Sequence, residues 1–596
     1  MQKYEAPIKD IEYLINSVFK INNYSNLDRF KKINPEITTM ILEEASKFTQ
    51  NVLLPLNQSG DSEGCKFEEG DVKTPDGFKE AYNTFIKGGW SSLTFDEEFG
   101  GQGLPTIIGV IVSEMIVSTN MAFGMYPGLT QGAYKAIEKI GNSEQKKLYL
   151  PKFSDGKWTG TMNLTEAHCG TDLGLIKTKA EPCPDGSYLI TGSKIFISAG
   201  EHDLSENIVH LVLARLPDAP TGIKGISLFI VPKFLSNDNG ELTDKNNVKC
   251  LSIENKMGIK ASSTCEMKYE SATGYLLGEK NKGMKAMFIM MNEARLGVGI
   301  QGLGMSEVAY QSAAEYTKDR LQGRSLNSPV NPELPADPII VHPDVRRMLL
   351  SVKSFNESAR ALSIWIALNI DIAEHHPDSD TKKNASEFLA LMTPIAKAFL
   401  TDTSFENVNL ALQCYGGHGY IRDHGMEQFV RDTRITQLYE GTSGIQALDL
   451  VGRKLPQDMG RLLRQFFHPV DKFIKENISD KDISDIIMPL AKSFARLQQA
   501  SAWVAENGMS NPNEAAGASS DYLKLFGIVT LGYMWAMMAK TSLSKLNEKD
   551  SDKQFHQDKI NLSKFYMNKI LPETSSLLSK ITAGSKTLMS IESSNF

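Results

Sequence analysis

The sequence predicts a multidomain α+β protein in which a β domain lies between helical domains. Apolar residues recur at three-to-four-residue spacing in the first part of the chain, which is the pattern of an amphipathic helix. After about residue 158 the pattern changes to short alternating runs of β-branched and aromatic residues, and from residue 283 it returns to helical spacing. We therefore expect an N-terminal helical domain over 1–160, a middle β-barrel domain over 161–284, a C-terminal four-helix bundle over 285–458 and an extra C-terminal helical domain over 459–596.

The composition is that of a globular protein with several domains. The 596 residues are 41% hydrophobic and 23% charged. The net charge of −7 argues against a nucleic-acid partner, because phosphate binding needs a basic surface. The first residues lack the apolar core of a signal peptide, and the longest apolar stretch, 526–539, is too short to span a bilayer comfortably. We expect a buried helix over 526–539, a cytoplasmic protein and no membrane span.

The six cysteines are scattered and form no C-x-x-C pair. They indicate neither a zinc site nor a disulfide framework, and reduced thiols in a cytosolic protein fit best. His168 and Cys169 are adjacent and resemble a metal-binding pair. Because adjacent side chains point apart on a strand, we expect no metal site there.

The two periodicities place helices and strands along the first half of the chain. Helices are expected at 8–19, 37–54 and 106–119, and strands at 188–191, 208–213 and 226–231. The segment 95–105 contains three glycines and a proline, so it is expected to be a loop. The strands are short and separated by turn signals, which favours a small barrel or a sandwich.

Long amphipathic helices are expected in the second half, at 284–318, 345–374 and 381–412, with a proline-rich loop at 326–337. Such helices, antiparallel through short connections, form a bundle. The glycines at 297, 299, 302 and 304 predict that another helix packs closely against the first of them. Residues from about 456 onward are expected to be helical, interrupted by a loop at 507–520.

One carboxylate has a chemically suggestive setting. Glu440 follows a short apolar and aromatic run and precedes Gly441, Thr442, Ser443 and Gly444. Apolar neighbours raise a carboxylate's pKa and make it a stronger base, and small residues let a ligand approach the backbone. A lone glutamate beside glycine is more often a solvated helix cap, however, and a G-G-x-G stretch such as 416–419 is more often a turn.

Several segments then coincide with one family. Residues 161–178 read TMNLTEAHCGTDLGLIKT, and KIFISAG follows at 194–200. Together with Q-x-x-G-G-x-G from Gln413 and Y-E-G-T-S from Tyr439, in this order, they resemble the acyl-CoA dehydrogenase family over residues 1–460. The remaining tail resembles large bacterial members that carry a C-terminal extension. The resemblance implies helical, β and four-helix domains, with FAD between the β domain and the bundle and reaching a neighbouring subunit.

The resemblance also implies the cofactor-binding residues. Thr165 matches a threonine that addresses the flavin ring, and a donor there tunes the reduced cofactor. Phe196 and Ser198 stand where the family usually has tryptophan and threonine, and they preserve an aromatic face and a hydroxyl. Arg320 would bind the FAD pyrophosphate of the partner subunit, for which its planar fork is suited, although an aromatic residue missing beside Gln322 leaves the register there open. The full implied set is Met162, Leu164, Thr165, Gly170, Thr171, Phe196, Ser198, Arg320, Gln413, Gly416, Gly417, Thr442 and Gly444.

Two departures from the family pattern bear on the site. Ala167 replaces the usual proline after Thr-Glu, which predicts a looser turn. Ala294 occupies the position where some relatives carry the catalytic glutamate, and Glu293 lies about 100° further round the helix, so Glu440 keeps the role of base. The substrate-binding residues implied by the resemblance are Thr171, Asn292, Arg295, Tyr439 and Gly441.

The implied reaction is FAD-dependent α,β-dehydrogenation of an acyl-CoA, with Glu440 removing the α-proton and an electron-transfer flavoprotein as acceptor. A short acyl group is expected, with 3-(methylthio)propanoyl-CoA as the leading candidate and a general fatty acyl-CoA dehydrogenase as the alternative. An oxidase and a catalytically silent scaffold also stay open. Because the family shares its FAD sites between subunits and the extension would cover a second interface, we expect a homodimer.

Overall fold

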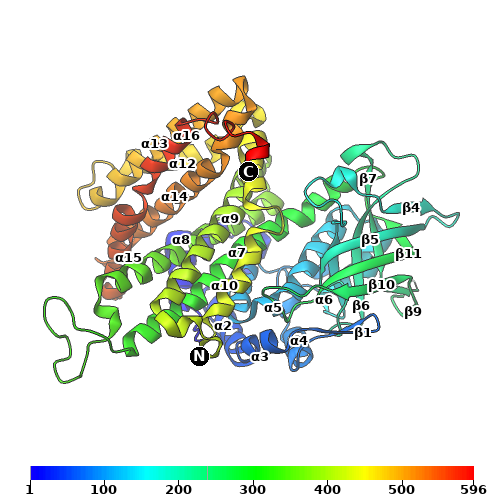
Figure 1. The fold of residues 1–596 in the computed structure, drawn as a ribbon, viewed down its shortest axis with the longest axis horizontal. Coiled ribbons are helices and arrows are strands. Elements are labelled where there is room, and N and C mark those ends of the chain that lie inside the picture. Colours follow the sequence, from blue (N-terminus) through cyan, green and yellow to red (C-terminus); the bar gives the residue numbers. More distant parts are fainter. Residues whose placement is uncertain (1, 238) are drawn as a thin grey trace. The chain divides into compact units, whose positions relative to one another are not determined.

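The computed structural model describes residues 2–237 and 239–596, and the chain divides into two compact units. The helical unit contains residues 2–44, 105–114 and 298–596. The sheet unit contains residues 45–104 and 115–297. Figure 1 shows the elements of both units in the colours of the sequence. The boundaries of the four domains expected from the sequence stay a prediction.

A seven-stranded sheet forms the core of the sheet unit (Figure 1). The order is β10-β11-β5-β4-β6-β3, and β7 pairs with both β11 and β6, so the pairings of β11, β5, β4, β6 and β7 close into a ring. Closure removes strand edges and favours the barrel over the sandwich. The strands are β3 (Trp158–Asn163), β4 (Lys179–Pro182), β5 (Tyr188–Ser198), β6 (Asn207–Arg215), β7 (Ile226–Pro232), β10 (Val248–Ile253) and β11 (Thr264–Leu276).

Shorter elements complete the sheet unit. Two small hairpins pair β1 (Lys66–Glu68) with β2 (Asp71–Lys73) and β8 (Phe234–Ser236) with β9 (Leu242–Lys245). The helices are α3 (Pro55–Glu63), α4 (Phe78–Lys87) and α6 (Ser143–Ser154), together with most of α5 (Thr106–Ile140) and the first part of α7 (Gly283–Asp319). The expected loop at 95–105 is confirmed, apart from one short 3₁₀ turn.

Helix α5 is longer than the expected helix at 106–119 because two helices join across a kink. Asn120 has non-helical φ and ψ of −159° and 90°. Its side chain accepts a hydrogen bond from the Phe123 N–H at 3.0 Å and donates to the Leu53 carbonyl at 3.3 Å. The amide therefore caps the Phe123 N–H, which the kink leaves without a helical partner, and it links α5 to the segment that ends at Leu53.

The helical unit is built on three long helices, α7, α8 (Pro343–His375) and α9 (Ser379–Cys414). Helix α9 packs against the glycines of α7, as expected. A methyl group at Gly299 would lie 3.1 Å from the Ala396 carbonyl oxygen, and one at Gly302 would lie 3.2 Å from that of Leu400. The unit also contains α1 (Ile8–Glu12), which continues as a π-helix over Tyr13–Val18, most of α2 (Pro35–Phe48), α10 (Met426–Arg434) and α11 (Ser443–Asp449).

The C-terminal extension contains α12 (Arg461–Asn477), α13 (Ser484–Ser510), α14 (Pro512–Lys545), α15 (Lys553–Phe565) and α16 (Glu573–Thr582). The expected loop at 507–520 is wrong, because only Asn511 separates α13 from α14. The Asn511 side chain accepts the Asn513 N–H at 3.1 Å, and Pro512 occupies the first helical position, so the apparent helix breakers form a cap.

Helices α5 and α14 are long and apolar enough to cross a membrane by length and composition alone. Their most apolar windows are 83% and 89% buried inside the protein, however, as in the core helices of a globular fold. The expected buried helix over 526–539 lies within α14 and is confirmed. These two helices are therefore weak evidence for a membrane span.

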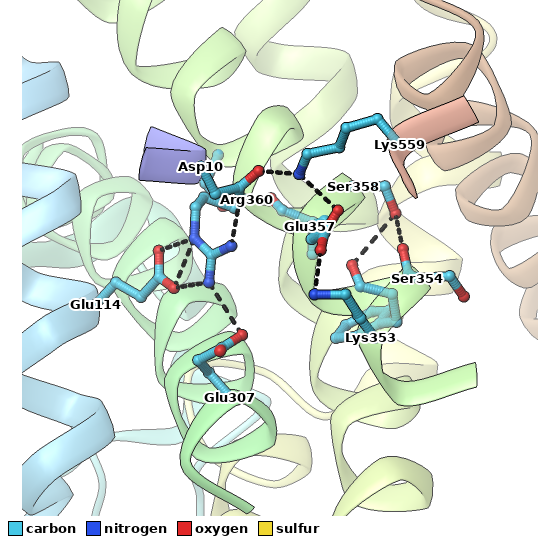
Figure 2. Close-up of polar contacts among 12 residues, drawn as sticks. Asp10, Glu114, Glu307, Lys353, Ser354, Glu357, Ser358, Arg360 and Lys559 are labelled. Atoms are coloured by element: carbon cyan, nitrogen blue, oxygen red, sulfur yellow. Dashed lines mark hydrogen bonds and ion pairs between the residues drawn. The ribbon is translucent and has the colours of Figure 1, made fainter. Parts of the chain in front are cut away.

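A buried charged cluster joins several segments of the helical unit (Figure 2). Its members are Asp10, Glu114, Glu307, Lys353, Glu357, Arg360 and Lys559. The guanidinium of Arg360 contacts Glu114 at 2.6 Å and Glu307 at 3.0 Å. Burial by itself would lower the pKa of Arg360, but these carboxylates hold it well above its ordinary value. Arg360 is therefore a permanent cation among carboxylates from three other segments of the chain.

The same cluster attaches the C-terminal extension. Lys559 on α15 contacts Asp10 from the N-terminal segment and lies 2.6 Å from Glu357 on α8 (Figure 2). Breaking a buried ion pair leaves an uncompensated charge, which is costly, so the cluster specifies which surfaces of these segments meet. We interpret the charged cluster as structural, because its charges are satisfied by one another.

Candidate active site

The sequence-predicted base lies in a strained turn of the helical unit. Glu440 has φ 57° and Gly441 has φ 87°, so both occupy the left-handed region. This conformation is unusual for a residue with a side chain, and it persists only where surrounding contacts fix it. Glu440 is half-buried, and Thr442 rather than Glu440 caps α11, by accepting the Ile445 N–H at 3.4 Å. The helix-cap interpretation of Glu440 is therefore wrong.

Hydrogen bonds from two helices fix this turn, which we call the base loop (residues 435–446). Gln446 Nε2 donates to the carbonyl oxygen of Glu440 at 3.0 Å, and Lys397 Nζ donates to that of Gly441 at 2.7 Å. Lys397 on α9 and Gln446 on α11 are both fully buried. Sequence reasoning missed both residues. The available signal was a lysine inside the otherwise apolar run LMTPIAKAFL of α9.

A second contact from α9 holds the two sides of the base loop. Asp402 Oδ1 accepts the Gln437 amide at 2.8 Å and the Ser443 hydroxyl at 2.6 Å. Tyr439, beside the base, donates its hydroxyl to Gln301 on α7. Burial first, and the nearby Glu440 second, raise the pKa of Tyr439, so it stays neutral at physiological pH. The base loop is thus attached to α7, α9 and α11.

In the sheet unit, the segment that contains Thr165 is also fixed by a buried lysine. Lys194 Nζ donates to the Leu164 carbonyl oxygen and to Glu166 Oε1, both at 2.9 Å. Burial would raise the pKa of Glu166, but Lys194, the Thr178 hydroxyl and the Lys177 N–H together hold it below its ordinary value. Burial lowers the pKa of Lys194, against the effect of Glu166. The segment is therefore held by an ion pair as well as by main-chain contacts.

The turn after Thr165 is closed even though Ala167 replaces proline. Glu166 and Cys169 exchange backbone hydrogen bonds of 2.9 and 3.0 Å. The Ile195 N–H donates to the Thr165 carbonyl at 2.9 Å and attaches the segment to β5. The expected loosening at Ala167 is not seen, because these backbone hydrogen bonds close the turn without a proline ring.

Phe196 lies at a bulge where the register of β5 against β11 shifts. It has φ 58° and is 60% exposed in the sheet unit. An aromatic ring of this size is seldom left so exposed, and a bulge is a common device for redirecting a side chain near a site. Its exposed face fits a flat aromatic group such as a flavin ring, and Ser198, two residues on, is half-buried.

Four predicted cofactor contacts lie on the surface of the helical unit. In the helical unit Arg320 is exposed after the end of α7, and methyl groups at Gly416, Gly417 and Gly444 would meet nothing within 4 Å. The open glycines leave room for a phosphate-bearing ligand to approach the backbone. Gly416 to Tyr420 form a 3₁₀ turn, which is the simpler interpretation of G-G-x-G. These features fit a dinucleotide cofactor.

The other predicted residues have varied exposure. On α7 Asn292 is exposed and Arg295 is buried. Residues that are exposed or half-buried are Met162, Leu164, Thr165, Gly170, Thr171, Gln413, Tyr439, Gly441 and Thr442. The assignment of each to cofactor or substrate stays a prediction.

The side chains of His168 and Cys169, which we expected to point apart, come together with that of Glu166. The ligand atoms of Glu166, His168 and Cys169 lie within 4.8 Å of one another, because this segment is a turn and not a strand. The Glu166 carboxylate already accepts from Lys194 and Thr178, and burial raises the pKa of the Cys169 thiol. The Lys194 ammonium, 2.9 Å from Glu166 Oε1, would repel a second cation at this carboxylate, so a metal site stays unexpected.

Comparison with known proteins agrees with this architecture. Models of the N-terminal, middle and C-terminal domains of acyl-CoA dehydrogenase match residues 35–157, 161–272 and 281–455. A model described as acetyl-CoA dehydrogenase C-terminal like matches residues 466–592. The chain is 41% identical to 3-methylmercaptopropionyl-CoA dehydrogenase of Ruegeria pomeroyi, over 97% of this chain and 98% of that protein.

Two further relatives support the same conclusion. A butyryl-CoA dehydrogenase of Syntrophomonas wolfei is 32% identical over 96% of this chain and 95% of that protein. A crystal structure of an acyl-CoA dehydrogenase complexed with FAD from Bacillus anthracis has a TM-score of 0.73 at 20% identity, covering 93% of this chain and 89% of that chain. The chain therefore belongs to the acyl-CoA dehydrogenase family: it is an FAD-dependent oxidoreductase with the helical, middle β and helical domains of that family and an extra C-terminal helical domain.

Proposed function

We propose that this protein dehydrogenates a short acyl-CoA between Cα and Cβ, with Glu440 as the base and 3-(methylthio)propanoyl-CoA as the preferred substrate. The observation that supports this chemistry is the conformation of Glu440. Its backbone is in the left-handed region, and side chains from α9 and α11 hold the backbone next to it. Strain at a residue capable of proton transfer is typical of a catalytic position.

The roles of the residues follow from their chemistry. Glu440 takes the α-proton of the thioester, and its own backbone N–H donates to the thioester oxygen as charge develops there. Such donors typically stabilise the transition state by about 3–4 kcal/mol each. FAD, when bound, supplies the acceptor for the β-hydrogen. Neutral Tyr439, held by Gln301, is an uncharged aromatic neighbour whose ring helps to keep water from the base.

For the cofactor, we propose that the exposed ring of Phe196 and the segment around Thr165 contact the flavin ring, while Arg320 binds the pyrophosphate of the FAD of the partner subunit. Gln413, Gly416 and Gly417 complete the phosphate and adenine contacts. The exposure of Phe196 and Arg320 and the space beside the glycines support these roles. Arginine suits a pyrophosphate because its fork donates in parallel.

The preferred substrate is proposed from similarity over the whole chain, extension included. The relative from Ruegeria pomeroyi is named for 3-methylmercaptopropionyl-CoA, and its similarity runs through the C-terminal extension as well as the three family domains. The same substrate would give the reaction a role in dimethylsulfoniopropionate degradation. A thioether and a methylene differ little in shape and polarity, so butanoyl-CoA and pentanoyl-CoA should also react.

The test is kcat/KM for 3-(methylthio)propanoyl-CoA and for straight-chain acyl-CoAs from four to sixteen carbons. Pockets discriminate a methylene-sized change by about 1–3 kcal/mol, so we expect butanoyl-CoA within about a hundredfold of the thioether substrate and much lower values for long chains. A maximum at twelve or more carbons would discard the thioether assignment and leave a general fatty acyl-CoA dehydrogenase.

We further propose an electron-transfer flavoprotein as acceptor, a homodimer as the assembly and the cytoplasm as the location. Anaerobic bleaching of bound flavin by an acyl-CoA, followed by admission of air, separates the alternatives. A scaffold shows no bleaching, and an oxidase recovers its colour rapidly in air without an acceptor protein. Light scattering of the full chain tests the dimer, and a tetramer mass would refute it.

A further inference from the structure

We propose that Lys397 and Gln446 are positioning residues for catalysis, because they lock the two successive peptide groups that orient Glu440. The inference rests on the proposed role of Glu440 as base. Lys397 and Gln446 act through the main chain of the base loop, so they are distinct from groups that touch the reacting atoms. Residues far from each other in the sequence, on α9 and α11, thereby define the direction of one carboxylate.

The geometry fixes adjacent peptide planes. Gln446 Nε2 holds the carbonyl of the peptide that follows Glu440, at 3.0 Å, and Lys397 Nζ holds the carbonyl of the next peptide, at 2.7 Å. The direction of the first carbonyl depends on ψ of Glu440 and φ of Gly441, and the direction of the second depends on ψ of Gly441. With both carbonyls held, the left-handed conformation of Glu440 cannot relax towards an ordinary one without loss of these hydrogen bonds.

The burial of Lys397 indicates that its hydrogen bond to the base loop has a specific role. Lys397 is fully buried on α9, with Ala396 and Ala398 as buried neighbours in the sequence. A buried ammonium is costly unless it is well hydrogen-bonded, so an apolar residue would be easier to accommodate at this position. The hydrogen bond from an ammonium to a carbonyl is charge-assisted and therefore stronger than a neutral one. Lys397 is thus a strong tether for the loop beside Glu440.

Gln446 and Gly441 fit each other closely. A methyl group at position 441 would lie 2.6 Å from Gln446 Nε2, so only glycine lets the amide reach the Glu440 carbonyl. Gly441 also has φ 87°, which disfavours any other residue. Asp402, on the same helix as Lys397, holds Gln437 and Ser443 on either side of the turn. The base is therefore supported from a rigid helix, which is how a catalytic geometry is kept within narrow limits.

The test uses the full-length, FAD-loaded protein and measures proton transfer separately from hydride transfer. An acyl-CoA with sulfur in place of the β-carbon has exchangeable α-protons but no β-hydrogen to transfer. We expect Lys397→Met and Gln446→Met each to lower the rate of α-proton exchange with D₂O, and kcat with a reactive substrate, by about tenfold to a hundredfold, as for an ångström-scale misplacement. KM and bound flavin should stay within about twofold of wild type.

Thr401→Val is the matched control. Thr401 is fully buried on α9 one turn beyond Lys397, and its hydroxyl donates to the Lys397 and Ala398 carbonyls of its own helix at 2.8 and 3.1 Å. Its removal should leave α-proton exchange and kcat within about twofold. A comparable loss in Thr401→Val would show that any damage to α9 slows the enzyme, and it would overturn the proposal.

Two further outcomes are decisive. Exchange and kcat within twofold of wild type in Lys397→Met and Gln446→Met would overturn the proposal, whatever happens to thermal stability. If Lys397→Met does not fold, Gln446→Met alone decides. Glu440→Gln, in parallel, must abolish α-proton exchange; if exchange survives that change, the assignment of the base fails, which is distinct from a failure of the positioning residues alone.

Discussion

Two buried lysines, one in each compact unit, support two segments of the proposed site in the same way. Lys397 donates to the carbonyl next to Glu440, and Lys194 donates to the carbonyl of Leu164, directly before Thr165. In the helical unit the supported region contains Glu440, a residue with a side chain in the left-handed conformation at φ 57°, and in the sheet unit Phe196, at φ 58°, lies two residues after Lys194 on β5. Both units therefore use a buried cation to hold a backbone carbonyl of the proposed site.

Lys194 and Lys397 differ in the groups that they contact. Lys194 pairs with the Glu166 carboxylate at 2.9 Å, whereas Lys397 donates to a neutral carbonyl of the base loop. The pKa of Glu166 is held below its ordinary value, so the pair contributes stability above the pKa of an unfolded glutamate. That stability is lost as pH falls through the lower folded value. From their positions, beside the Thr165 segment and beside Glu440, we infer that Lys194 supports folding and cofactor retention, and that Lys397 supports catalysis.

The largest expected effect on stability is that of Lys194→Met. The change leaves the Glu166 charge buried without its cation, which typically costs about 3–5 kcal/mol. Denaturant unfolding should show a loss of this size, together with weaker retention of FAD. Lys177→Met is the control, because that side chain is exposed on the same segment. A loss below about 1 kcal/mol is typical of a surface ion pair. That result would show that Lys194 does not stabilise the fold as a buried ion pair, and it would contradict the proposed difference between the two lysines.

Arg320→Ala should weaken FAD binding with little effect on folding. A pyrophosphate that loses a charge-assisted hydrogen-bond partner loses about 1.5–3 kcal/mol, or roughly tenfold to a hundredfold in affinity. Flavin content after extensive dialysis measures this. Lys318→Ala is matched to it, because Lys318 is exposed near the same helix end and forms only a long 3.7 Å pair with Glu315 among its described contacts. Equal flavin content in both variants would count against Arg320.

A further expected effect is a change in pH dependence in the sheet unit, which is small near neutral pH and grows as the pH falls. Burial first, and Lys233 second, lower the pKa of His202 and His210 to about 3. Unfolded histidines bind protons below about pH 6.5, so the unfolded state gains protons first and stability falls as pH drops from about 6.5 towards 3. Each histidine contributes about 1.4 kcal/mol per pH unit in that window. His210→Gln should reduce the slope of unfolding free energy against pH by one proton, and an unchanged slope would contradict this.

Most helices and strands follow from local patterns, and the structure explains the exceptions. The residues around Asn511 include glycines, asparagines and a proline, which predict a loop when taken separately. In the structure a single asparagine cap with proline at the next position turns the chain between two helices. Helix α5 is the opposite case. Its apolar pattern continues past residue 119, but Asn120 kinks the helix.

Some residues of the candidate site can likewise be predicted from local sequence patterns, and others cannot. Glu440, Thr165 and Arg320 are predicted from short motifs, because the chemistry proposed for each depends on its immediate neighbours in the sequence. Lys397 lies 44 residues from the carbonyl it holds, and Lys194 lies 30 residues from its own. No local pattern encodes such a contact; only the packing of α9 against the base loop, or of β5 against the Thr165 segment, brings the groups together.

The central claim is that Glu440 is the base, and anaerobic single-turnover reduction of bound flavin tests it most directly. Glu440→Gln preserves the size of the side chain and removes its ability to take a proton. With 3-(methylthio)propanoyl-CoA we predict that the variant binds FAD and ligand but bleaches the flavin at least about a thousandfold more slowly than wild type, within the usual contribution of a general base. Bleaching within about tenfold of the wild-type rate would contradict the account.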